Sequence, residues 1–238
     1  MIVALENAYR SEFLFLPTRN GEGKLIGLEI VTNFTGVENA LRTPTGLVMP
    51  RLSAGEVLTL FREQLALLES CQHFFIQQQL TAWININEIV ADALLSDKSL
   101  MAIVKRISFL EFTVNENFTD LDRLTENHQL VRLINHKDLT LANFGAGDAS
   151  TKAVFAGLFT RVMLDKNFIQ TQSRSRSFSP FMRAIIAQIK PYCVSIMAAG
   201  VDDAALRDRL QGYDLAGMQG ALWPAVAVSA LTTLVQEQ

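Results

Sequence analysis

Cysteine and histidine are scarce in this 238-residue chain, which contains two cysteines and three histidines. Cys71 and Cys193 stand too far apart in the sequence to indicate a metal-binding pair, and they suggest no disulfide framework. The three histidines, His73, His128 and His136, share no spacing typical of metal ligands, so a zinc site is not expected. The pattern indicates two buried thiols in a reducing compartment.

Long apolar runs and strong net charge are also lacking. No stretch approaches the ~20 uninterrupted apolar residues that a membrane-spanning helix needs. The first ten residues carry no basic leader, and Glu6 and Arg10 interrupt their apolar pattern. The net charge is only −3, so no overall field favours nucleic acid or an anionic membrane. We therefore expect a cytoplasmic protein that binds neither membrane nor nucleic acid directly.

Common catalytic and phosphate-binding signatures are absent as well. The glycine-rich stretch at 143–147 lacks the Walker lysine and the dinucleotide-binding spacing. No nucleophile elbow surrounds a serine. The segment SRSRSF at 173–178 carries two arginines in an acidic chain, which is typical of a solvated connection more than of an RNA-binding patch.

What the chain does have is ample apolar material: hydrophobic residues make up 49% of it and charged residues 19%. We find no repeat, linker or low-complexity run, and the length suits one domain over residues 1–238. Eight strand-like runs alternate with helical patterns, and they predict a (β/α)8-type barrel. A doubly wound open sheet is the alternative. The predicted strands are 12–17, 24–31, 81–87, 107–114, 137–143, 158–165, 192–199 and 213–219.

Two helices have readable beginnings. Ser53 is followed three residues later by Glu56, the pattern of a capping box. Apolar residues then recur at helical spacing and predict one buried stripe: Val57, Leu60, Phe61, Leu65 and Leu68. A second helix is expected to follow Pro180, with Ile185, Ile186 and Ile189 on its buried side.

Several polar residues stand near the predicted strand ends with the parity that points into a barrel. In such barrels the functional groups gather at the carboxyl ends of the strands. One polar residue there is usually structural, whereas several on separate strands suggest a present or former site. The residues are Glu29, Asn85, Glu111, Asn143, Asp165 and Gln219.

These residues lie in segments that resemble the EAL family of cyclic di-GMP phosphodiesterases, in order and over nearly the whole chain. The resemblance implies a single modified (β/α)8 barrel. It also implies a site where two divalent metals activate water and hold the phosphate of cyclic di-GMP. The segments are GLEIVTNF (27–34), WININ (83–87), LEFTV (110–114), NFGAGDAS (143–150), VMLDKNFI (162–169), AAGVD (198–202) and QGALWP (219–224).

The chain departs from this family where the chemistry requires charge. Relative to the family pattern, carboxylates are replaced at Val114, Ala142, Asn143 and Ala199, and the lysine is replaced by Met163. Hard divalent cations need oxygen ligands, preferably carboxylates, and a two-metal site needs bridging ones. We therefore expect no catalytic residue, no metal and no cofactor. What is left is a vestigial pocket outlined by Glu29, Asn85, Glu111, Asp165 and Gln219.

Within the family, the resemblance is to a stand-alone, degenerate branch of flagellar regulators. It is carried by SCQHFFIQ (70–77), GLFTRV (157–162), LDKNFIQ (164–170) and LWPAV (222–226). It implies binding to FlhD, a subunit of the flagellar activator FlhDC, and repression of flagellar genes; the partner-binding surface is unknown. The alternative is a receptor that binds cyclic di-GMP without hydrolysing it. Leu16 and Asn33 argue against nucleotide binding, because they replace a glutamine and a cationic arginine of the family.

Overall fold

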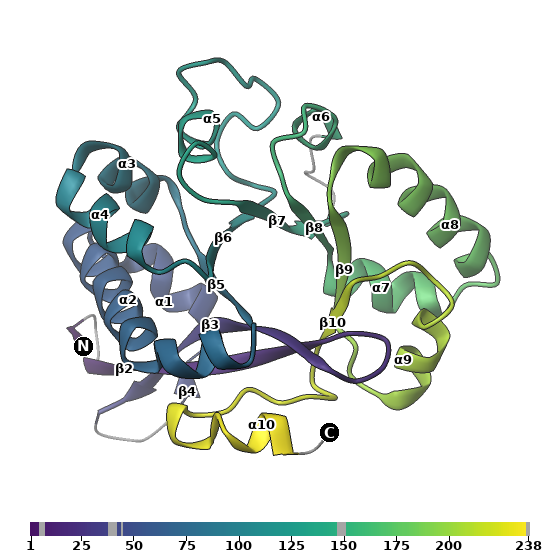
Figure 1. Cartoon of the computed structure of the whole chain (residues 1–238), viewed down its shortest axis with the longest axis horizontal. Helices are drawn as coiled ribbons and strands as arrows, with labels where there is room; N and C mark the ends of the chain where they lie inside the picture. The colour runs from purple at the N-terminus through teal and green to yellow at the C-terminus, as the bar shows by residue number, and fades with distance from the viewer. Residues whose placement is uncertain (5–7, 38–41, 44, 147–150, 237–238) are drawn as a thin grey trace.

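The fold is a closed barrel surrounded by helices (Figure 1). The computed structural model describes residues 1–4, 8–37, 42–43, 45–146 and 151–236. Eight strands close the barrel because β2 pairs with β10 on one side and with β3 on the other, so the sheet has no open ends within this ring. The open-sheet alternative is thereby excluded. The barrel strands are β2 (Ala8–Arg19), β3 (Leu25–Gly36), β5 (Thr81–Asn85), β6 (Leu110–Asn115), β7 (Leu139–Phe144), β8 (Arg161–Leu164), β9 (Ser195–Ala199) and β10 (Gly217–Gln219).

Each of the eight strand predictions contains or overlaps one of these strands, so the predicted barrel is confirmed. The first two strands depart from a regular (β/α)8 pattern, because a tight turn joins them in place of a helix. Asn20 makes this turn: its backbone N–H donates to the Lys24 carbonyl at 2.9 Å, and its side-chain oxygen accepts from the N–H groups of Glu22 and Lys24. β2 is therefore antiparallel to both of its barrel neighbours. Two short strands, β1 (Ile2–Ala4) and β4 (Arg42–Thr43), extend the sheet beyond the barrel.

The helices form an outer ring around the barrel (Figure 1). They are α1 (Thr45–Val48), α2 (Ala54–Gln77), α3 (Glu88–Ser96), α4 (Lys98–Arg106), α5 (Gln129–Leu133), α6 (Thr151–Phe155), α7 (Lys166–Ser173), α8 (Phe178–Ile189), α9 (Ala204–Leu210) and α10 (Thr233–Gln236). Short 3-10 turns are η1 (Met49–Arg51), η2 (Lys190–Tyr192) and η3 (Val228–Ala230). Among the described helices, none combines the length and the apolar character needed to cross a membrane.

The two predicted helix beginnings are present, one of them shifted. At α2 the Ser53 hydroxyl accepts the Glu56 N–H at 3.3 Å, and the Glu56 carboxylate accepts the Ser53 N–H at 2.8 Å, which completes the predicted capping box. The predicted apolar stripe of α2 is buried. α8 begins at Phe178, so Pro180 lies within its first turn. Its Ile186 and Ile189 are buried as predicted, whereas Ile185 is half-buried.

Two apolar clusters lie on opposite sides of the barrel wall. The larger one fills the space between strands and helices; for example, the ring of Phe112 on β6 lies 6.1 Å from that of Phe61 on α2. The smaller one consists of Trp83, Met163 and Met197, with Ala199 packed against it. Because side chains alternate along a strand, the residues next to Phe112 point into the barrel or toward its mouths. This alternation decides which side chains can reach a site within the barrel.

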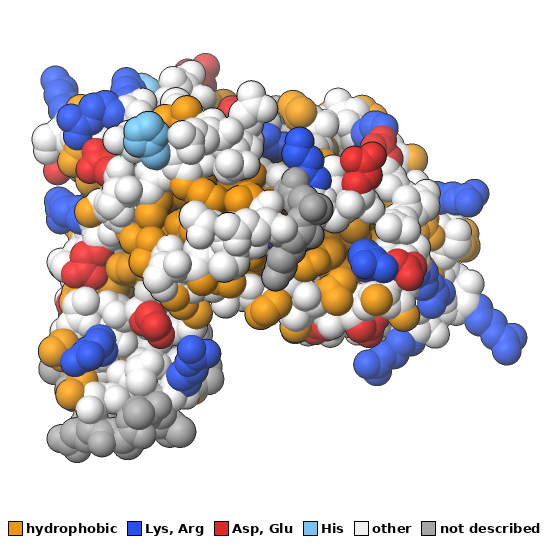
Figure 2. All heavy atoms as spheres, turned by 60° about the horizontal axis from the view of Figure 1, so that its bottom comes forward, with side chains coloured by type: hydrophobic (Ala, Val, Ile, Leu, Met, Phe, Trp, Pro, Cys, Tyr) orange, Lys and Arg blue, Asp and Glu red, His pale blue; other side chains and the backbone are white. Residues whose placement is uncertain are grey.

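The C-terminal segment pairs with the edge of β2 at one antiparallel bridge. Phe15 and Val226 exchange backbone hydrogen bonds of 2.8 and 2.9 Å. Arg19 at the end of β2 donates to the carbonyl of Leu234 at 3.0 Å and to that of Gly23 at 2.8 Å. In Figure 1 α10 lies below β2, and Figure 2 turns this side forward. There, hydrophobic side chains gather in the angle between the body of the molecule and a projecting lobe.

Candidate functional site

Glu29 and Gln219, two of the residues that the sequence analysis assigned to the pocket, meet inside the barrel. The side-chain amide of Gln219 donates to the Glu29 carboxylate at 3.1 Å, which links β3 to β10 across 190 residues of sequence. Burial raises the pKa of Glu29, and the hydrogen bond from Gln219 opposes that rise. The hydrogen bond from Gln219 engages one oxygen of the Glu29 carboxylate.

On β5, β6 and β7, amide and hydroxyl side chains near the strand ends form hydrogen bonds with one another. The Asn85 amide donates to the Thr113 hydroxyl at 3.3 Å. The Asn143 side-chain amide donates to the side-chain oxygen of Asn115 at 2.7 Å, and the backbone of Asn143 has a φ of 60° at an irregularity in β7. Asn143 is exposed, and Ala142 beside it is half-buried and carries no side-chain ligand atom. Neither of these two hydrogen bonds involves a carboxylate.

Asp165 has a structural role at the beginning of α7. Its carboxylate accepts the backbone N–H of Phe168 at 2.9 Å, the bond of a helix N-cap. Asn87 caps α3 and Asp203 caps α9 in the same way. Polar residues that follow barrel strands thus stabilise the helices that come next, and a cap alone accounts for Asp165.

The prediction that Glu111 lies at the carboxyl end of its strand is wrong. β6 begins at Leu110, so Glu111 is the second residue and lies at the opposite mouth of the barrel. The predicted strand began at 107, but Ile107 instead ends α4. Glu111 therefore does not belong to a pocket with Glu29 and Asp165.

At that amino-terminal mouth Glu111 is the centre of a buried network. Arg161 donates to both of its carboxylate oxygens, at 2.9 and 3.1 Å, and the indole N–H of Trp83 donates at 3.1 Å. The hydroxyl of Thr140 donates at 3.4 Å. Arg161 also donates to the Ser195 hydroxyl at 2.9 Å. The sequence prediction missed Arg161, although it shares the inward parity of Met163 and Asp165 on the same strand segment.

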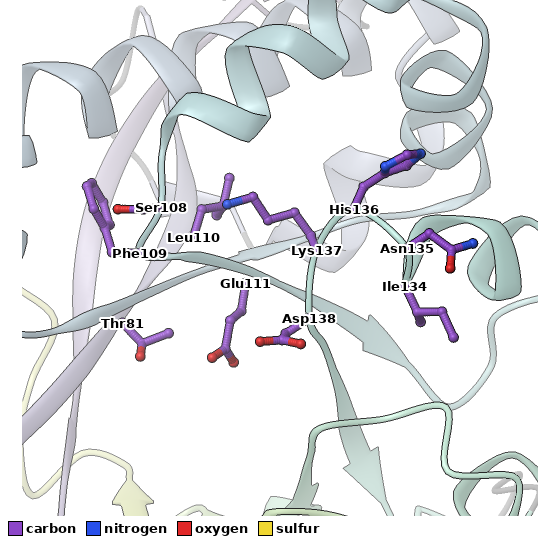
Figure 3. A pocket seen from close by; sticks show the side chains of 10 residues that line it. All are labelled: Thr81, Ser108, Phe109, Leu110, Glu111, Ile134, Asn135, His136, Lys137 and Asp138. Atoms are coloured by element: carbon purple, nitrogen blue, oxygen red, sulfur yellow. The ribbon is translucent and has the colours of Figure 1, made fainter.

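Figure 3 shows the pocket that opens beside this network, with a volume of about 380 Å³. The carboxylates of Glu111 and Asp138 point toward the same space. Asp138 accepts the Thr160 hydroxyl at 3.1 Å, and the amine of Lys137 turns away to the Ile107 carbonyl at 2.5 Å. Burial lowers the pKa of Lys137, and the charges of Asp138 and Glu111 oppose that effect. Because these polar groups already have partners in the protein, the pocket resembles a structural junction more than a reaction centre.

Three of the five positions where the family pattern has charged residues, Val114, Met163 and Ala199, fall into two environments. Met163 and Ala199 belong to the small apolar cluster with Trp83 and Met197, so the middle of the barrel is apolar. Val114 points the other way and is fully buried in the outer core. Its replacement of a carboxylate therefore fills the outer core and adds nothing to the barrel interior.

A salt-bridged cluster ties the loops at the carboxyl-terminal mouth together. Asp202 accepts the backbone N–H of Ala221 at 2.9 Å, the Lys166 amine at 3.0 Å and the Gln170 amide at 2.8 Å. The bond from Ala221 contributes most to lowering the pKa of Asp202, with smaller contributions from Lys166 and Gln170. The Lys166 charge is thereby engaged within the protein.

The described residues do not fit two divalent cations. Nowhere in the described part of the chain do three or more His, Cys, Asp or Glu side chains come together in a way that could hold a metal ion. At the carboxyl-terminal mouth, Asp165 caps a helix, Glu29 accepts a hydrogen bond from Gln219, and Ala142 and Ala199 offer no ligand atom. Bridging carboxylates, which a two-metal site requires, are missing from this described arrangement.

Comparison with known proteins places these features in a family context. The model of the family described as "EAL domain" matches residues 19–225. A Salmonella typhimurium LT2 protein named "Anti-FlhC(2)FlhD(4) factor YdiV" is 50% identical over 236 residues, covering 99% of this chain and all of its own. A relative from Escherichia coli K12 whose name contains the same words is 45% identical over 236 residues, with the same coverage. The crystal structure of the EAL-like domain protein YdiV matches with a TM-score of 0.89 and 45% identity, over 98% of this chain and 100% of that one.

Proposed function

Since this chain belongs to the EAL-domain family, we propose that it uses the family's barrel to bind a protein and has no phosphodiesterase activity. The observation that carries the proposal is full-length similarity: relatives 50% identical over 99% of the chain bear the name anti-FlhC(2)FlhD(4) factor. By this proposal the protein binds the FlhC(2)FlhD(4) activator through its FlhD subunit. It thereby represses flagellar gene expression.

The loss of catalysis is supported by the state of the barrel interior. A buried Met163 stands where the family pattern has a lysine, and it packs on Trp83 and Met197. An ammonium group that stabilises charge in a transition state typically contributes several kcal/mol, and a thioether contributes none of it. With Ala142 and Ala199 at the mouth, metal activation of water has no support from the described ligands.

Weak binding of cyclic di-GMP, the alternative function, has little support. A dianionic nucleotide needs cationic groups at the mouth, whereas Lys166 is paired with Asp202. Asn33, which replaces the family's arginine, lies opposite Glu12 in the β2–β3 register. An acidic residue opposite this position does not favour an anionic ligand.

The protein acts in this proposal by covering a surface of its target, in the cytoplasm and without contacting DNA. Its net charge of −3 gives no general attraction to promoter DNA. Masking a protein surface requires shape and a few well-placed contacts, and both can be supplied by the outside of a barrel.

The test is co-elution of the purified chain with purified FlhC(2)FlhD(4) on gel filtration at micromolar concentration. A shared peak is expected, and separate elution at tens of micromolar contradicts the proposal. In parallel, no turnover of cyclic di-GMP is expected with Mg²⁺ or Mn²⁺. Activity in the variant Ala142→Asp/Asn143→Asp/Met163→Lys, but not in the parent chain, would attribute the inactivity to these positions.

A further inference from the structure

A groove with a basic rim and an apolar floor lies where α3, α4 and α5 meet. Its volume is about 440 Å³. The floor contains Leu94 and Met101, which are buried, and the half-buried Leu95. The rim is formed by four exposed side chains: Lys98, Lys105, Arg132 and His136. No aspartate or glutamate is among the described residues that line it.

A single residue creates the angle between the two long walls of this groove. Asp97 ends α3 and caps α4, accepting the N–H groups of Ser99 at 2.9 Å and Leu100 at 3.2 Å. The chain therefore changes direction between Ser96 and Lys98. Both helices contribute apolar side chains to the same floor, while α5 closes the third side.

The position of Lys98 is not explained by helix stability. It is the first residue of α4, where the helix dipole disfavours a positive charge. Lys105 and Arg132 lie in last turns, where the dipole favours them, but no described carboxylate lies within salt-bridge distance of Lys98, Lys105 or Arg132. Lys98, Lys105 and Arg132 thus form a basic cluster around an apolar floor, with no acidic residue among the described residues that line the groove. Such a cluster is suited to an acidic binding partner.

An exposed apolar side chain extends the groove toward the amino-terminal mouth of the barrel. Ile134 is 40% exposed and lies on the connection after α5. Asn135 and His136, the next two residues, line both the groove and the pocket of Figure 3. The two hollows are therefore neighbours. An apolar floor, a basic rim and an exposed isoleucine together form one continuous surface.

We propose that this groove is where the chain receives its protein partner, through an acidic amphipathic helix of the FlhC(2)FlhD(4) complex. Apolar side chains of that helix pack on the floor of the groove, and its carboxylates face Lys98, Lys105 and Arg132. A small anion fits less well, because Lys98 and Lys105 stand seven residues apart on α4, Arg132 lies on α5, and an apolar floor lies between them. This inference rests on the proposed function and specifies its surface.

The test reverses the charge of the rim. In the variant Lys98→Glu/Lys105→Glu/Arg132→Glu, affinity for FlhC(2)FlhD(4) is expected to fall at least tenfold, measured by calorimetry or biolayer interferometry. The matched control Arg174→Glu/Arg176→Glu/Arg183→Glu makes the same change in net charge at exposed arginines on the α7–α8 side. It is expected to bind within about twofold of the parent. Circular dichroism and thermal melting check that both variants fold.

A second variant tests the floor without changing any charge. Ala102 is exposed in α4 and lines the groove, so Ala102→Trp fills the space while the helix can form. It is expected to weaken binding at least tenfold as well. Equal binding by both groove variants and the parent overturns the inference, as does displacement of the complex by millimolar inorganic phosphate but not by a poly-glutamate peptide. If the parent itself fails to bind, the proposed function fails first.

Discussion

Glu111 and Arg161, fifty residues apart in sequence, form a two-hydrogen-bond ion pair inside the barrel at 2.9 and 3.1 Å. Their strands, β6 and β8, are not neighbours, because β7 lies between them. The pair therefore fastens the barrel wall across an intervening strand, and Thr140 of β7 joins it. A charged contact of this kind is a structural element at the mouth where catalysis is not expected.

Removing one partner of this pair should destabilise the fold strongly. Arg161→Met leaves the Glu111 charge with only neutral partners, and we expect a loss of about 2–4 kcal/mol in the free energy of unfolding. The double variant Glu111→Leu/Arg161→Met should lose less free energy of unfolding than the two single variants together, because no buried charge is then left without its partner. Urea denaturation measures both. Arg106→Met, which breaks the exposed contact to Glu69, is the control and should cost under about 1 kcal/mol; an equal loss there would refute the special role of Glu111.

Glu29→Gln should stabilise the protein at neutral pH. Because the folded state raises the pKa of Glu29, this group favours folding only while it is protonated, and its contribution is lost as the pH rises through the folded pKa. The neutral amide introduced by this substitution avoids that loss, and its carbonyl oxygen can still accept from Gln219. Thermal melting from pH 4 to pH 8 should show the variant gaining on the parent as the pH increases above the ordinary glutamate value. If the difference in melting temperature between the variant and the parent is the same at every pH, the ionisation of Glu29 does not affect the stability of the fold.

Met163→Lys should destabilise the protein, and the loss should shrink with rising pH. The ammonium would lie against Trp83 and Met197, and its burial costs roughly 2–4 kcal/mol. Burial lowers the folded pKa of such a lysine, so the unfolded state binds more protons and stability rises with pH. Met163→Leu is the control and should cost under about 1.5 kcal/mol at all pH values. A pH-independent result for the lysine variant would place position 163 in contact with water.

Arg19→Ala should loosen the C-terminal segment. The Arg19 guanidinium is buried and bonds the carbonyls of Leu234 and Gly23, while its Nε has no hydrogen-bond partner among the described residues. Losing two charge-assisted bonds should cost about 2–3 kcal/mol. Hydrogen exchange should rise in residues 228–236 and remain unchanged in the helices around β6. Arg10→Ala, an exposed arginine on the same strand, should alter neither quantity.

Much of the barrel could be predicted from the sequence because its strands are buried on their outer faces. Apolar runs such as that around Phe112 mark each strand plainly. The two longest strands were predicted too short, at 12–17 and 24–31, because β2 and β3 continue into polar residues as far as Ala8 and Gly36. The polar ends of β2 and β3 are extended because the two strands pair with each other in an antiparallel hairpin. The periodicity of apolar residues does not reveal such pairing.

The candidate site was predicted less well, for reasons that Glu111 and Asp165 illustrate. Inward parity was right for Glu111, but parity does not say at which end of a strand a residue lies. Asp165 was at the expected end, yet its local bond to Phe168 is a helix cap, a signal that the sequence also contains. The ring of contacts among Trp83, Met163 and Met197 depends on barrel closure, so no local pattern could reveal it.

The antiparallel strand β2 has a consequence for the order in which the molecule is made. It is synthesised before β10, yet one of its edges pairs with β10, the last strand of the barrel in chain order. At about 5–20 residues per second, the stretch between Gly36 and Gly217 takes on the order of ten to forty seconds to synthesise. Throughout that interval the part of this edge that β1 does not cover has unpaired backbone groups, the usual template for aggregation. Production of this protein in cells should therefore depend on chaperones that hold the early hairpin until the last strand arrives.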